Sequence, residues 1–354
     1  MAVIAVDLFC GVGGLTCGLR KAGINVVAGI DLDSTCRYAY ESNNHATFIA
    51  KNIAEVKGTE IDNFFGKDDV KVLVGCAPCQ PFSKYTQRYR KQGRKDDKWK
   101  LLYEIERLIA EVQPVVVSME NVPELINEVV FDDFVEALKK MGYYVSYSIV
   151  YCPDYQVPQI RKRLVLLASK LGSIQIIPPI LKPQKYISVR KAIGKLPALL
   201  DGEVDAKDSI HCCSKLSEKN RKRIRASIPG GTWKDWSDEL KLDCHIRETG
   251  KGYGAVYGRM LWDEPSPTIT TQFFGYGNGR FGHPEQDRAL SFREGAILQS
   301  FPKNYKFIKK GEKINRKELG IHIGNAVPVK LGEAIGITIL QHIELYKNSL
   351  GEKR

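Results

Sequence analysis

The sequence lacks several features that mark particular classes of protein. It has no apolar run near the ~18 residues of a membrane-spanning helix, and no leader-type pattern precedes Val3-Ile4-Ala5-Val6, which is typical of a first strand. Its nine cysteines follow no regular spacing, which argues against a disulfide scaffold. Internal repeats and low-complexity tracts are missing as well. We therefore expect a globular protein of the reducing cytoplasm, with no membrane partner.

Acidic residues are fewer than basic residues. The 354 residues include 53 Lys and Arg against 41 Asp and Glu, a net charge of +12 that favours a polyanionic partner. Residues 84–100 hold eight Lys/Arg against two Asp, and Lys215–Arg225 holds six against Glu218. A single basic run is usually a solvated face. Two such runs, the first interleaved with Tyr and Trp, favour nucleic acid.

Apolar β-type runs alternate with helical periodicity over about the first 170 residues. We expect strands at 2–8, 26–30, 47–49, 70–74, 114–119, 143–151 and 164–169, and helices at 15–22, 34–42, 60–65, 98–112 and 131–141. This alternation predicts an α/β fold with a mostly parallel central sheet covered on both faces. Residues 171–290 show no sustained period and predict a smaller, irregular domain, followed by helices at 291–300 and 329–346.

A glycine-rich turn follows the first predicted strand. The stretch Asp7-Leu8-Phe9-Cys10-Gly11-Val12-Gly13-Gly14 leads into a helix, so a ligand can approach the backbone and the free N–H groups of that helix. Asp31 ends the next strand 20 residues after Gly11, the spacing at which a carboxylate holds ribose hydroxyls in dinucleotide folds. Thr16 replaces the third glycine of G-x-G-x-x-G, so the turn favours an adenosine-type ligand over NAD.

A second turn carries a candidate nucleophile. The apolar run Val72–Gly75 leads into Cys76-Ala77-Pro78-Cys79-Gln80-Pro81, and reactive groups of open α/β sheets lie at the carboxyl ends of the strands. The two prolines stiffen the backbone around Cys79, and fixed geometry favours thiolate attack. From these residues alone, a buried structural cysteine and a C-x-x-C redox dithiol remain as alternatives.

Further blocks follow in order along the chain. They are Glu120-Asn121-Val122, Gln159-Ile160-Arg161-Lys162-Arg163, Arg293-Glu294 with Leu298–Pro302, and Gly324-Asn325-Ala326-Val327-Pro328. With the two turns, they resemble the ordered blocks of the DNA (cytosine-5) methyltransferase family across nearly the whole chain outside about 175–255. The resemblance implies a Rossmann-like methyltransferase fold with a catalytic domain over 1–185 and 320–354. It also implies a small domain over 186–319, with target recognition roughly within 175–255.

The resemblance implies a chemistry for this catalytic domain. In the family, a cysteine thiolate adds to C6 of an extruded cytosine, and C5 then attacks the methyl group of S-adenosyl-L-methionine. Cys79 matches the nucleophile, and Glu120 matches the acid that hydrogen-bonds or protonates N3. Arg163 matches the arginine that holds O2, with Arg161 supporting it on the same strand face. Taken singly, Glu120 would more often be the cap of the following turn, and the two arginines a solvated edge face.

The family's cofactor and DNA contacts can be carried over in the same way. The implied cofactor residues are Phe9, Gly11, Gly13, Gly14, Asp31, Leu32, Asn52, Ile53, Pro78, Leu101, Asn325 and Val327. Asn52 departs from the family's frequent Asp, but its carbonyl can still accept from the adenine amino group. The implied DNA contacts are Ser83, Lys84, Arg88, Arg90, Arg94, Arg221, Arg223 and Arg225. Residues 84–98 match the loop that closes over the extruded base.

We therefore expect a monomer that methylates a short, specific sequence in double-stranded DNA and lies in the cytoplasm, at the nucleoid. It would act alone or beside a restriction endonuclease that cuts the same site without forming a stable complex. We expect no metal, because His211-Cys212-Cys213 and Cys244-His245 lack the C-x₂₋₄-C spacing of zinc sites.

Three alternatives remain. The related enzymes that act on tRNA typically carry a Cys-Phe-Thr block in the second domain, which this sequence lacks. A catalytically inactive DNA-binding relative would not need Cys79, Glu120 and Arg163 together. An NAD oxidoreductase with a C-x-x-C motif is disfavoured by Thr16 and by the later blocks.

Overall fold

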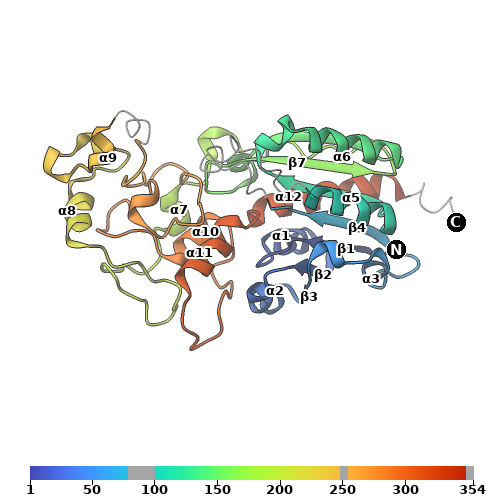
Figure 1. The fold of residues 1–354 in the computed structure, drawn as a ribbon, viewed down its shortest axis with the longest axis horizontal. Coiled ribbons are helices and arrows are strands. Elements are labelled where there is room, and N and C mark those ends of the chain that lie inside the picture. Colours follow the sequence, from blue (N-terminus) through green and yellow to red (C-terminus); the bar gives the residue numbers. More distant parts are fainter. Residues whose placement is uncertain (79–99, 248–253, 348–354) are drawn as a thin grey trace. The chain divides into compact units, whose positions relative to one another are not determined.

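The chain forms two compact units. The computed structural model describes residues 1–78, 100–247 and 254–347 (Figure 1). Unit 1 comprises Met1–Tyr155, Lys162–Ile180 and Val327–Arg354, and unit 2 comprises Gln156–Arg161 and Leu181–Ala326. Unit 1 is thus built from both ends of the chain, and most of unit 2 lies between them in the sequence.

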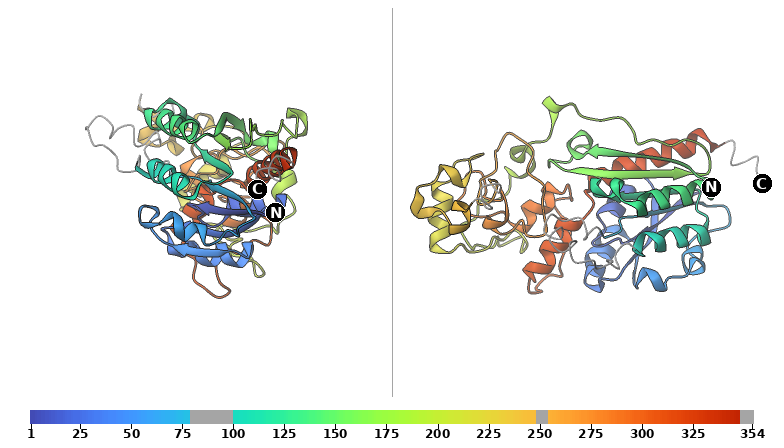
Figure 2. Two further views of the ribbon diagram at one scale, coloured as in Figure 1. Left: turned by 90° about the vertical axis from the view of Figure 1, so that its right-hand side faces the viewer. Right: turned by 45° about the horizontal axis from the view of Figure 1, so that its top comes forward.

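Unit 1 contains a seven-stranded sheet of order β3-β2-β1-β4-β5-β7-β6. The strands are β1 (Val3–Leu8), β2 (Asn25–Asp31), β3 (Thr47–Ala50), β4 (Val70–Gly75), β5 (Val116–Asn121), β6 (Tyr144–Tyr151) and β7 (Lys162–Ser169). The first five pair in parallel, whereas β7 runs antiparallel to both β5 and β6 (Figure 2). The predicted α/β fold with a mostly parallel sheet is confirmed, and no strand boundary differs from its expected position by more than two residues.

Helices cover the sheet because its central strands are apolar on both sides. Val72, Leu73 and Val74 of β4 are at most 1% exposed, which is typical of a buried parallel strand. The helices of unit 1 are α1 (Gly14–Ala22), α2 (Arg37–Asn44), α3 (Gly58–Asp62), α5 (Lys100–Val112), α6 (Val129–Lys140) and α12 (Val329–Leu345). Buried side chains of α3, α5 and α6 share one core cluster with Val6 and Leu73 of the sheet.

Glycines let the last helix pack closely against the first. A Cβ atom on Gly18 of α1 would lie 2.3 Å from the carbonyl oxygen of Val329, and one on Gly332 of α12 would lie 3.0 Å from that of Leu15. Only glycine permits this approach without displacing the backbone. α12 is further held by His342, whose Nε2 lies 2.7 Å from the Ser169 Oγ of β7.

One described segment, Arg316–Leu345, is long and apolar enough to cross a membrane by length and composition. Two thirds (67%) of its most apolar window is buried inside the structure. Pro328 also separates it into two helices, α11 (Arg316–Asn325) and α12. A segment buried to this extent belongs to the core of the protein.

Unit 2 has less regular structure. Its other helices are α7 (Val189–Ile193), α8 (Glu218–Ala226), α9 (Asp243–Ile246) and α10 (Phe292–Leu298). The sequence predicted α10 but missed α7, α8, α9 and α11. α8 buries only Arg223 and Ile224, so it offers no apolar period, and its start is fixed by Ser217, which accepts from the backbone N–H of Asn220.

A buried ion pair lies in the core of unit 2. Arg288 donates from Nη1 and Nη2 to the two carboxylate oxygens of Glu294, both at 2.8 Å, and the side chains are 0% and 1% exposed. Ser291 caps α10 and exchanges hydrogen bonds with Glu294. Burial alone would raise the pKa of Glu294, but the hydrogen bonds and charge of Arg288 lower it to about 2.

His283 faces the same pair, and we expect it to make stability depend on pH. Its Nε2 lies 3.8 Å from Glu294, and burial lowers its pKa to about 4 from 6.5. As the pH falls, the imidazole is protonated in the unfolded chain first, so the contribution of His283 to the free energy of unfolding should drop by up to ~3 kcal/mol between pH 6.5 and 4. Glu294, with its lowered pKa, loses its own contribution only below pH ~4.5.

Urea titrations at a series of pH values would measure this dependence. Relative to the wild type, His283→Gln should show a less positive slope of unfolding free energy against pH between pH 4 and 6.5, whatever its effect on absolute stability. The same slope in wild type and variant would contradict the assignment.

Candidate active site

The turn after β1 exposes its backbone to a ligand. Phe9, Gly11 and Gly13 have φ angles of 58°, 49° and 85°, the left-handed region that favours glycine. A Cβ atom on Gly11 would meet nothing within 4 Å, so backbone conformation rather than crowding calls for glycine here. α1 begins at Gly14 without a side-chain cap; the backbone N–H of Thr16 donates to the Asp7 carboxyl group, which leaves those of Gly14 and Leu15 for an anionic group.

A buried carboxyl group lies beside this turn. Asp7 is 1% exposed, and its Oδ2 accepts from Thr16 Oγ1 at 2.6 Å. Among the described residues, Asp7 Oδ1 has no hydrogen-bond partner. Burial, with a contribution from the charge of Asp31, raises the pKa of Asp7 to about 7. Thr16, which interrupts the dinucleotide pattern, therefore serves to hold this carboxyl group, a role the sequence did not indicate.

Asp31 and Leu32 follow β2 at the same edge of the sheet. Asp31 accepts from the backbone N–H of Gly11 at 2.8 Å and from that of Asp33 at 2.9 Å. The carboxylate predicted to hold a ribose thus also ties the glycine-rich turn to β2. Leu32 is 71% exposed and is accessible to a ligand.

The segment after β3 holds two further predicted cofactor residues. Asn52 accepts from the backbone N–H two residues on, at 3.2 Å, and Ile53 is buried in the core cluster that Leu101 of α5 packs against. Arg107 of α5 donates to the carbonyl oxygens of Ile53 and Val56 at 3.2 and 2.9 Å. Arg107 therefore fixes this segment, and the sequence did not predict it.

Glu120 is the last residue but one of β5 and lies between two side chains from neighbouring parts of the sheet. Its Oε2 is 2.7 Å from the thiol of Cys76, which follows β4, and its Oε1 is 2.8 Å from Nε of Arg163 on β7. The Glu120 and Arg163 side chains are only 3% and 14% exposed. The Nε–H of Arg163 does not point along that line, so within the described ranges Oε1 accepts no aligned hydrogen bond. The strand order β4-β5-β7 brings these distant residues together.

Asn121 adds a second link to the turn after β4. Its Nδ2 donates to the carbonyl oxygen of Ala77 at 3.2 Å, and its Oδ1 accepts from the backbone N–H of Val122 at 2.8 Å. Glu120 and Asn121 thus meet the turn directly before Pro78, which is exposed. Cys79 and the predicted DNA contacts Ser83, Lys84, Arg88, Arg90 and Arg94 lie outside the described residues.

Among the predicted catalytic and cofactor residues, Arg161 and Asn325 belong to unit 2. Arg161 precedes β7 and does not lie on it, so the expected shared strand face with Arg163 is wrong. It is 5% exposed and donates to the carbonyl oxygen of Ile269 at 3.1 Å, beside the buried pair Gln159–Gln299. Asn325 is the last residue of α11, whereas Val327 opens the final segment of unit 1 and is buried.

The predicted DNA contacts on α8 differ in exposure. Arg225 is exposed and lies 3.2 Å from Asp287, and Arg221 is half-buried. Arg223 is only 4% exposed; it donates to the carbonyl oxygen of Leu240 at 2.8 Å, and its guanidinium lies 5.9 Å from the ring centre of Trp236. A DNA contact does not fit this burial, and we assign Arg223 to the core of unit 2 instead.

Aromatic side chains complete that core. Trp233 and Trp236 are buried, and His245 stacks on Trp233 with ring centres 4.3 Å apart. Their burial assigns these tryptophans to the core of unit 2.

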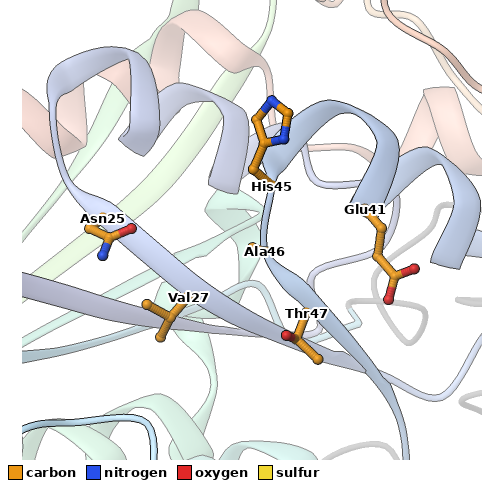
Figure 3. Close-up of a pocket in the computed structure, with 6 residues that line it drawn as sticks. All are labelled: Asn25, Val27, Glu41, His45, Ala46 and Thr47. Atoms are coloured by element: carbon orange, nitrogen blue, oxygen red, sulfur yellow. The ribbon is translucent and has the colours of Figure 1, made fainter.

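A surface cavity of about 370 Å³ lies elsewhere in unit 1 (Figure 3). It is lined by Asn25, Val27, Glu41, His45, Ala46 and Thr47. Asn25 and Thr47 begin β2 and β3, so the cavity lies at the amino ends of these strands. Ligands of open α/β sheets bind at the carboxyl ends, where the glycine-rich turn, Asp31 and Glu120 are found.

Comparison with known proteins identifies the family. Residues 3–341 match the C-5 cytosine-specific DNA methylases. The chain is 52% identical, over 97% of both chains, to a Type II methylase, M.HgiDII, of Herpetosiphon aurantiacus. It is 33% identical to the Type II methyltransferase M1.BsuMI of Bacillus subtilis, over 94% of this chain and 79% of the relative.

Solved structures share the fold. A putative DNA modification methyltransferase encoded within an Escherichia coli prophage superposes with a TM-score of 0.73 at 19% identity, covering 97% of this chain and all (100%) of the other. The S. pombe Dnmt2 methyltransferase superposes with a TM-score of 0.62 at 17% identity, over 97% and 98% of the two chains. This family and fold imply an enzyme that depends on S-adenosylmethionine and acts on DNA. The chain belongs to the C-5 cytosine-specific DNA methylases and is a DNA (cytosine-5-)-methyltransferase.

Proposed function

We propose that the protein methylates one cytosine of a short DNA sequence through a covalent bond between Cys79 and C6 of the extruded base. The observation that carries this proposal is the meeting of Glu120 and Arg163 at the strand ends, linked through Cys76 and Ala77 to the turn that leads to Cys79. An acid beside a cation suits a ring that gains negative charge during attack.

The turn after β1 fits S-adenosylmethionine. The uncapped N-terminus of α1 suits the carboxylate of the methionine part, and Asp31 suits the ribose hydroxyls. Leu32 and Phe9 are available to flank the adenine ring, with Ile53 and Leu101 behind. The bound cofactor supplies an electrophilic methyl group on a sulfonium.

The reaction then follows from the side chains. The thiolate of Cys79 adds to C6, while Glu120 hydrogen-bonds or protonates N3 and Arg163 holds O2, so that C5 becomes nucleophilic enough to take the methyl group. Loss of the C5 proton then expels the Cys79 thiolate and restores the aromatic ring. The bond between Cys79 and C6 is thereby broken, a proton given to N3 returns to Glu120, and S-adenosylhomocysteine leaves, so the enzyme is regenerated.

The partner is double-stranded DNA, with residues 84–98 closing over the extruded base and unit 2 reading the sequence. Because the curated relatives carry Type II names, we place the protein in a restriction–modification system, beside an endonuclease that recognises the same site without a stable complex. We further propose that it acts as a monomer, in the cytoplasm at the nucleoid.

A methyl-donor assay tests this proposal. Purified protein should transfer label from S-adenosylmethionine to duplex DNA but not to tRNA. Bisulfite sequencing of DNA from a methylation-free host that expresses the protein should show one short motif methylated almost completely. Transfer to tRNA alone would support the related tRNA class, and no transfer to either substrate would support an inactive relative.

We expect Asp31→Ala to weaken S-adenosylhomocysteine binding about 10- to 100-fold, because a charged acceptor for two hydroxyls is lost. Isothermal titration calorimetry measures the affinity. Asp33→Ala is the matched control, since Asp33 is an exposed carboxylate two residues away that accepts from Thr35. Equal affinities in the two variants would refute the ribose contact.

A further inference from the structure

The chemistry above does not use Cys76, although its thiol reaches the central acid. Cys76 Sγ lies 2.7 Å from Glu120 Oε2, as donor to acceptor. The backbone N–H of Cys76 donates to the carbonyl oxygen of Leu8 at 3.3 Å, so the residue is also tied to β1. The next residue, Ala77, is held by Asn121. The turn that carries the thiol is therefore held by β1 on one side of β4 and by β5 on the other.

The two oxygens of Glu120 are in different environments. Oε2 is occupied by the thiol, whereas Oε1 lies next to the Arg163 guanidinium and accepts no aligned hydrogen bond from any described residue. A carboxylate oxygen this deeply buried is costly to leave without a donor. Oε1 is thus the oxygen that gains most from a donor on an incoming base.

We propose that Cys76 is a positioning residue that assigns the two oxygens of Glu120, holding Oε2 so that Oε1 is presented to the cytosine. The inference rests on the proposed function, in which Glu120 contacts the base. The terminal torsion of a glutamate side chain is broad, so an ion pair at one oxygen alone leaves the carboxylate free to rotate. A thiol is a weak donor, and it fixes the orientation without competing strongly with the base for the carboxylate.

Three variants test this role under steady-state conditions. Cys76→Ala should lower kcat about 10-fold, the effect of one lost hydrogen bond, with the KM for S-adenosylmethionine unchanged. Cys76→Ser should recover most of that loss, because its hydroxyl can donate to the same oxygen. Cys17→Ala is the control, since Cys17 is another cysteine of unit 1, buried on α1 and not in contact with Glu120 in the described structure. Loss of kcat that serine does not recover would refute positioning by hydrogen bonding.

A double-mutant cycle separates this inference from the proposed function. Glu120→Gln alone should reduce kcat about 10²- to 10⁴-fold, as expected for loss of a general acid. If Cys76 acts through Glu120, adding Cys76→Ala to that variant should cause less than a ~3-fold further loss. A full, multiplicative loss would overturn the positioning role and leave the proposed function standing. A fully active Glu120→Gln variant would instead overturn the proposed function.

Discussion

Cys79→Ser is expected to lower methyl transfer by more than about 10³-fold, because a serine hydroxyl is far less ionised than a thiol near neutral pH. Binding of S-adenosylhomocysteine should change little, since the proposed cofactor contacts come chiefly from the turn after β1 and from Asp31. Calorimetry and a methyl-transfer assay on the same preparation would measure both quantities.

The covalent bond itself can be trapped. DNA that carries 5-fluorocytosine should form a stable adduct with the wild type, because fluorine cannot leave as a proton does in the final elimination. Cys79→Ala should form none. Cys76 provides the internal check, since it is a second thiol only three residues away. An adduct mapped to Cys76 in the Cys79→Ala variant would refute the choice of nucleophile.

Exchanging part of unit 2 should move methylation completely to another sequence. We define the recognition lobe as residues 217–258, which contain α8 and α9. Base-edge contacts must come from outside the blocks shared by the family, and the lobe carries exposed cations such as Lys219, Lys222 and Arg225. A chimera with the lobe of a relative should methylate that relative's motif, as read by bisulfite sequencing.

The boundaries of the lobe follow from its contacts. Arg259, just outside it, donates to the carbonyl oxygens of Ile224 and Ser227 at 3.0 Å each. These acceptors are backbone groups, so an exchanged lobe can still satisfy Arg259 whatever its side chains. Trp236 likewise donates to Ser227 within the lobe at 2.9 Å.

The wider region predicted from the sequence, 175–255, serves as the contrasting exchange. It would separate Asp208 from Arg293 and His211 from Ser291, contacts of 2.5 and 2.9 Å that join this region to α10. The ion pair between Asp208 and Arg293 is part-buried, with the Asp208 side chain 32% exposed, and its loss should make this chimera less stable in urea than the lobe exchange. A lobe chimera that is active but retains the original motif would show that specificity lies elsewhere.

The sequence predicted the sheet well because its strands are apolar runs bounded by turns. Val72, Leu73 and Val74 are all buried. A short apolar run of this kind, lying between helical segments of the sequence, is typical of a buried strand in a parallel sheet. Unit 2 has few apolar runs or helical periods, so the same reasoning predicted little of its structure. α8 is stabilised by a serine cap and by the stacking of Arg223 on Trp236, neither of which produces a hydrophobic period.

The sequence predicted which residues belong to the site, but not which of them contact one another. Glu120 and Arg163 were expected to act together, yet their pairing depends on β7 being inserted antiparallel beside β5, which no local pattern reveals. The Cys76 thiol was noticed only as part of a C-x-x-C motif, because its partner lies 44 residues away. The roles of Arg107 and Thr16 were missed, because Arg107 binds backbone carbonyl oxygens and Thr16 binds a buried carboxyl group.

The glycine seam between α1 and α12 has a consequence for synthesis on the ribosome. The surface of α1 around Gly18 is completed only by Val329 and Gly332, which are translated after all of unit 2. At about 5–20 residues per second, the ~150 residues between Ile180 and Val329 take roughly 7–30 s to emerge. During that interval the α12-facing side of α1 in the nascent catalytic unit stays uncovered, because the residues that pack on it have not yet been made.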